Sequence, residues 1–96
     1  MALCEIREYP NVEELRKLAE EVLKKRGFDI QRIVEFNDPT TPVRFYLTPR
    51  NEEEEILPPV ADIVVRWHKV TQNVAWATGA DLVIYTHPSD IVIPLM

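Results

Sequence analysis

His87 and Asp90 are the residues whose types and spacing most directly suggest chemistry. They stand three positions apart in His87-Pro88-Ser89-Asp90, directly after an apolar stretch. Such a turn can bring an imidazole and a carboxylate together, for proton transfer or as two metal ligands. Two ligands do not make a metal site, so we assign neither a metal nor a cofactor. The more common role of such an aspartate is to bond the turn backbone. A hydrolase that uses His87 and Asp90 is therefore our second hypothesis.

A second group of residues combines arginine with aromatic side chains. Arg32, Arg44 and Arg50 surround a predicted hairpin that also contains Phe45 and Tyr46. Arginines and aromatic rings on a sheet are what single-stranded RNA readers use, but the aromatic-glycine signature of those modules is missing. The net charge of −5 also opposes phosphate binding. RNA binding is the third hypothesis and a nucleic-acid partner is not expected, although Arg44 could hold a small anionic ligand.

The usual catalytic motifs are missing from the sequence. Two glycines cannot build a phosphate-binding loop, and the only serine, Ser89, lies in a probable turn rather than in a nucleophile motif. Cys4 is the only cysteine, which excludes an intramolecular disulfide and is typical of a buried structural thiol. We therefore lean towards a protein that is not an enzyme.

The elements that must position these residues follow from hydrophobic periodicity. The length of 96 residues allows a single domain, 1–96. Residues 11–26 predict a helix, with Asn11 as N-cap, Glu14 completing a capping box and Gly27 after the last turn. Helical spacing after Pro58-Pro59 predicts a second helix over 58–78, which Gly79 ends. The rival interpretation is a buried strand at 63–67, because β-branched residues are dense there. Strands are expected at 3–9, 28–36, 43–48, 81–87 and 91–95.

The order of these elements predicts an α+β fold. It is β-α-β-β-α-β with one more strand, which is the ferredoxin-like split βαβ pattern. In that pattern both helices cover one face of an antiparallel sheet, and here an extra C-terminal strand would lie at the sheet edge, as Pro94 requires. Many unrelated functions share this pattern, so it does not define an activity.

Two surfaces are candidates for contact with a partner. The sheet face away from the helices would carry all three tyrosines together with Arg44, and tyrosine and arginine mark contact surfaces. We therefore assign binding roles to four residues on this face: Arg44, Tyr46, Tyr85 and His87. The predicted second helix is apolar on two sides, so its second side would bury Val65, Gln72 and Trp76 against another subunit. The alternative is that the helix at 11–26 alone covers this side. Both surfaces predict a homo-oligomer, at least a dimer.

The leading hypothesis is a small oligomeric binding or interaction protein. The frequent proline, glutamate, lysine and arginine are typical of thermophile proteins. The chain shows neither a signal peptide nor a run of apolar residues long enough for a membrane span, so we expect a cytoplasmic protein without membrane contact.

Overall fold

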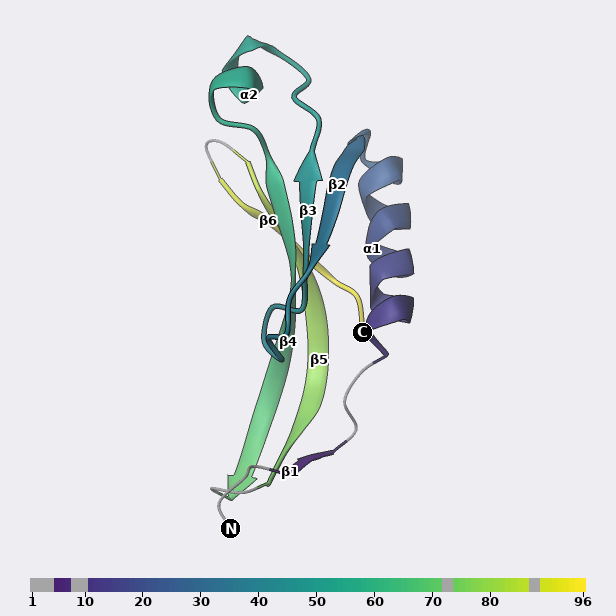
Figure 1. The fold of residues 1–96 in the computed structure, drawn as a ribbon, viewed down its shortest axis with the longest axis vertical. Helices are drawn as coiled ribbons and strands as arrows, with labels where there is room; N and C mark the ends of the chain where they lie inside the picture. The colour runs from purple at the N-terminus through teal and green to yellow at the C-terminus, as the bar shows by residue number, and fades with distance from the viewer. Residues whose placement is uncertain (1–4, 8–10, 72–73, 87–88) are drawn as a thin grey trace.

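The computed structural model describes residues 5–7, 11–71, 74–86 and 89–96. The molecule is elongated, with extents of 52 × 22 × 20 Å, and one long helix stands along one side of a sheet (Figure 1). The elements in chain order are β1 (Glu5–Arg7), α1 (Val12–Lys25), β2 (Ile30–Glu35), β3 (Val43–Leu47), α2 (Glu52–Ile56), β4 (Val60–Thr71), β5 (Val74–Tyr85) and β6 (Ile91–Pro94).

The sheet has the strand order β1-β5-β4-β3-β2, and β6 also pairs with β5. All pairings are antiparallel except that of β1 with β5, which is parallel. β1 lies beside one end of β5, at Val74, and β6 lies beside the other end, where Ile84 pairs with Ile91. β4 and β5 are therefore the two central strands, and they extend beyond β2, β3 and α1 as an arm whose far end is flanked by β1 (Figure 1).

Helix α1 forms where the sequence predicts it. The Asn11 side chain accepts a hydrogen bond from the N–H of Glu14, at 3.2 Å, and so caps the first turn. Gly27 follows the helix with φ of 83°, a conformation that favours glycine. One side of α1 packs on the sheet and buries Leu15, Ala19 and Leu23.

The core lies between α1 and one face of the sheet. It consists of alternate residues of three strands, as period-2 packing requires. These residues are Val43, Phe45 and Leu47 of β3, Ala61, Ile63 and Val65 of β4, and Ala80, Leu82 and Ile84 of β5, with Phe28 at one end. The face of the sheet opposite α1 has no helix along it (Figure 1), and we call it the open face.

The helix predicted over 58–78 is wrong, because this segment forms β4 and the first part of β5. Ala61, Ile63 and Val65 point to the core, while Val60 and Val64 lie on the open face. Valines on both faces of the strand happen to match helical spacing, which hid the period of two. The rival strand at 63–67 is the interpretation that the structure supports, although the strand is much longer.

Gly79 does not end a helix but lies within β5, opposite Arg66 of β4. A Cβ atom at this position would overlap the guanidinium of Arg66, which lies across the glycine. Arg66 also contacts Asp81, with 3.6 Å between Nε and Oδ2, and donates from Nη2 to the Met96 carbonyl at 3.3 Å. Gly79 therefore makes room for a side chain that ties β4 to the C-terminal segment.

The register of β2 also differs from the expected alternation. A bulge between Ile30 and Arg32 shifts the strand by one residue. Ile33 and Glu35 therefore turn towards α1, where Glu35 accepts a hydrogen bond from Arg16 at 3.4 Å. Arg32 lies on the open face instead.

The α+β class is confirmed. The ferredoxin-like arrangement is not confirmed, because strands replace its second helix. The only other helix in the described residues, α2, has five residues and lies between β3 and β4. Within the described ranges, no helix combines the length and apolar character needed to cross a membrane.

Candidate functional site

An arginine and a buried aspartate occupy the centre of the open face. Arg44 of β3 and Asp62 of β4 are directly opposite each other in the sheet. Arg44 donates from Nε to Oδ1 of Asp62 at 2.7 Å and from Nη2 to Oδ2 at 2.9 Å, which is the bidentate geometry of a strong charge-assisted pair. Asp62 is only 4% exposed, whereas the Arg44 side chain is 40% exposed. The pair is therefore neutral as a unit, and its arginine faces solvent.

Two tyrosines lie in the next row of the open face, Tyr46 on β3 and Tyr85 on β5. Burial raises the pKa of the Tyr85 phenol, and the charge and hydrogen bonding of Asp62 raise it further. Hydrogen bonding to Asp62, and then to Tyr46, raises the pKa of Arg44 above its usual range. Tyr46 also lies under the guanidinium of Arg32, with 4.6 Å from Cζ to the ring centroid. Tyr46 is thus in contact with Arg32, and Tyr85 lies near the carboxylate of Asp62.

The registers of four strand pairs align five residues in one row across the open face. Arg32 pairs with Tyr46, Tyr46 with Val60 and Val60 with Tyr85. Because Ile84 pairs with Ile91, the next position along β5, Tyr85, stands level with Asp90. We call this set the tyrosine row: Arg32, Tyr46, Val60, Tyr85 and Asp90.

Hollows lie on both sides of Arg44. One, of about 410 Å³, is lined by Arg44, Val60, Tyr85 and Asp90 together with the chain at Leu57 and Pro58. The other, of about 370 Å³, lies between Arg44, Asp62 and the turn that joins β2 to β3. Arg44 thus stands between two concave surfaces on the same face.

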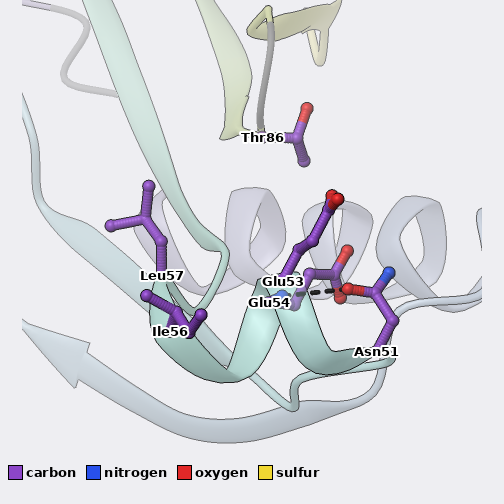
Figure 2. Close-up of a pocket in the computed structure, with 6 residues that line it drawn as sticks. All are labelled: Asn51, Glu53, Glu54, Ile56, Leu57 and Thr86. Carbon is purple, nitrogen blue, oxygen red and sulfur yellow. Dashed lines mark hydrogen bonds between the residues drawn. The ribbon is translucent and has the colours of Figure 1, made fainter.

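A third hollow, of about 390 Å³, lies at the end of the molecule beside α2. Figure 2 shows Glu53 reaching towards Thr86 across this space, while Ile56 and Leu57 lie together on one side. Asn51 caps α2 by accepting a hydrogen bond from the N–H of Glu54 at 2.9 Å. The acidic segment Glu52–Ile56 thus forms a short helix that Asn51 caps.

Neither family models, curated proteins nor solved structures give a match to this chain. We therefore infer the function from the residues of the open face.

The open face contains three of the four residues to which the sequence assigns a binding role. Arg44, Tyr46 and Tyr85 lie together there, as expected. His87 lies outside the described residues, so the pairing of His87 with Asp90 is not described either. Asp90 itself is exposed and lines the hollow beside Tyr85.

The three residues expected at a subunit interface separate into different environments. Val65 is 2% exposed and belongs to the hydrophobic core of this chain, so no partner subunit is needed to cover it. Trp76 is half-buried on β5, opposite His68, with 5.6 Å between the ring centroids. Gln72 lies outside the described residues. Within the described part of 58–78, strands replace the helix on which this common surface was predicted.

Asp62 is the site residue that sequence reasoning missed. The available signal is a single charged residue within the apolar run Val60-Ala61-Asp62-Ile63-Val64-Val65. A buried carboxylate needs a partner, and a strand interpretation of this run would have placed Asp62 on the same face as Arg44. The helix interpretation placed Asp62 on the solvent-exposed, charged side of the predicted helix instead.

Arg44 is neutralised by Asp62, whereas the exposed Arg32 contacts only the uncharged ring of Tyr46 among the contacts described above. Among the residues that the structure describes, no group of three or more His, Cys, Asp or Glu side chains could hold a metal ion.

Proposed function

We propose that this protein is a small oligomeric interaction protein whose contact surface is the open face. The observation that supports this most is the composition of the face, where Tyr46 and Tyr85 lie near the neutral ion pair of Arg44 with the buried Asp62. Arginine and tyrosine are enriched among residues that dominate binding energy, and such residues act from desolvated positions near the centre of an interface.

Fixed side chains favour binding because less conformational entropy is lost on association. Arg44 is held at two points by Asp62, and Tyr46 is held between Arg44 and Arg32. The neutral centre matters as well, because a chain with net charge −5 must meet a second copy without strong repulsion at the contact.

The test compares two faces of the molecule. Tyr85 on the open face and Leu18 on α1 have similar exposures, 40% and 43%. The variant Tyr46→Ala/Tyr85→Ala should lower the average mass in sedimentation equilibrium, because each anchor contributes about 1 kcal/mol or more to association. Leu18→Ala should leave the mass unchanged. Equal masses for the wild type and the tyrosine variant, with folding verified by circular dichroism, would contradict the proposal.

A further inference from the structure

The tyrosine row has an order that is complementary to itself when it is reversed. Read across the sheet it is Arg32, Tyr46, Val60, Tyr85 and Asp90, contributed by β2, β3, β4, β5 and the residue before β6. Read backwards, each tyrosine meets the other tyrosine, the valine meets itself, and the positive end meets the negative end. The two charged ends are separated by about 19 Å, which is four strand spacings.

The geometry points to a symmetric dimer, resting on the proposed function, in which two open faces pack together around a two-fold axis parallel to β4. Sheets that pack face to face keep their strands aligned to within about 30°. Rotation about an axis along the strands keeps each row at its own height and reverses its order. Arg32 of one copy then faces Asp90 of the partner, and Tyr46 faces the partner's Tyr85.

The two end residues have charge available for this contact. Both are exposed, and the guanidinium of Arg32 contacts the uncharged ring of Tyr46. The charge of Asp90 contributes to the raised pKa of Tyr85, which is consistent with its place beside that tyrosine. On the axis itself the next row brings the two copies of Asp62 together, but each is 4% exposed and already neutralised by Arg44, so the pairing adds little repulsion.

Charge reversal tests this arrangement. Arg32→Glu places two carboxylates opposite each other at both ends of the dimer, and Asp90→Arg places two guanidinium groups there. Each single variant should weaken self-association about tenfold, because like charges at an interface are repelled twice per dimer. The double variant Arg32→Glu/Asp90→Arg should recover wild-type association to within about threefold. Lys25→Glu, at the exposed end of α1, changes the net charge by the same amount as Arg32→Glu and should have no effect.

Mixing the two single variants gives the sharpest result. In a mixed dimer each altered end meets a partner of opposite charge, so an equimolar mixture should associate about tenfold more tightly than either variant alone. If the wild type dimerises and Tyr46→Ala/Tyr85→Ala does not, but mixing gives no gain, the open face is the interface and the proposed arrangement is wrong. If neither the wild type nor the mixture associates, both the arrangement and the proposed function fail.

Discussion

The ion pair of Arg44 and Asp62 predicts an unequal response to the loss of either partner. Arg44→Met leaves a carboxylate that is 4% exposed without its counter-ion, and removing one partner of a buried pair costs about 3–5 kcal/mol. Asp62→Leu leaves an arginine whose side chain is 40% exposed, so water can solvate it. That loss should destabilise the fold by about 1–2 kcal/mol. This figure includes the loss of hydrogen bonding between the Tyr85 hydroxyl and Asp62.

The double variant Arg44→Met/Asp62→Leu isolates the interaction. With both charges replaced by apolar side chains, stability should return to within about 1 kcal/mol of the wild type, because hydrophobic replacement of a buried pair is often neutral. The coupling free energy of the cycle is then at least about 3 kcal/mol. Urea unfolding followed by circular dichroism measures all four proteins, at one fixed concentration because association also contributes to stability. Equal losses in the two single variants, or a double variant that loses their sum, would refute this reasoning.

Three further predictions concern other contacts. Gly79→Ala should displace the Arg66 guanidinium from Asp81 and lower the free energy of unfolding, measured in urea, by up to about 1 kcal/mol. In an Arg66→Ala background the same change should be neutral or stabilising. Tyr85 should ionise above the ordinary phenol value of about 10 in an absorbance titration. Because its pKa is raised in the folded state, its contribution to folding stability is complete below that pH and is lost as pH rises through the folded pKa. Tyr85→Phe should remove the phase of the absorbance titration that occurs at the highest pH. Trp67→Phe deletes the hydrogen bond from Nε1 to the Pro39 carbonyl, at 3.0 Å, and should lower the free energy of unfolding by about 1 kcal/mol; an unchanged unfolding midpoint would contradict this.

The sequence predicted the elements whose signals are local. Helix α1 has a cap at Asn11, an apolar stripe and Gly27, so three independent features agree on its bounds. The hairpin of β2 and β3 was predicted for the same reason, since Val43, Phe45 and Leu47 alternate cleanly with polar residues. The bulge in β2 has no comparable local signal, because it depends on how the strand meets β3.

The segment after Pro59 could not be assigned from periodicity because it is apolar on both faces. Val60 and Val64 are half-buried on the open face while Ile63 and Val65 are in the core, so the apolar residues fit a period of 3.6 as well as a period of two. The density of β-branched residues was the better guide. The same error removed Asp62 from consideration, whereas Arg44, Tyr46 and Tyr85 were found because the segments around them had been assigned to strands.

Sedimentation equilibrium of the wild-type chain across the micromolar concentration range tests the central claim most directly. Self-association through the open face predicts an average mass that rises with concentration towards twice the 11.2 kDa of the chain. A mass of 11.2 kDa at every concentration would contradict it.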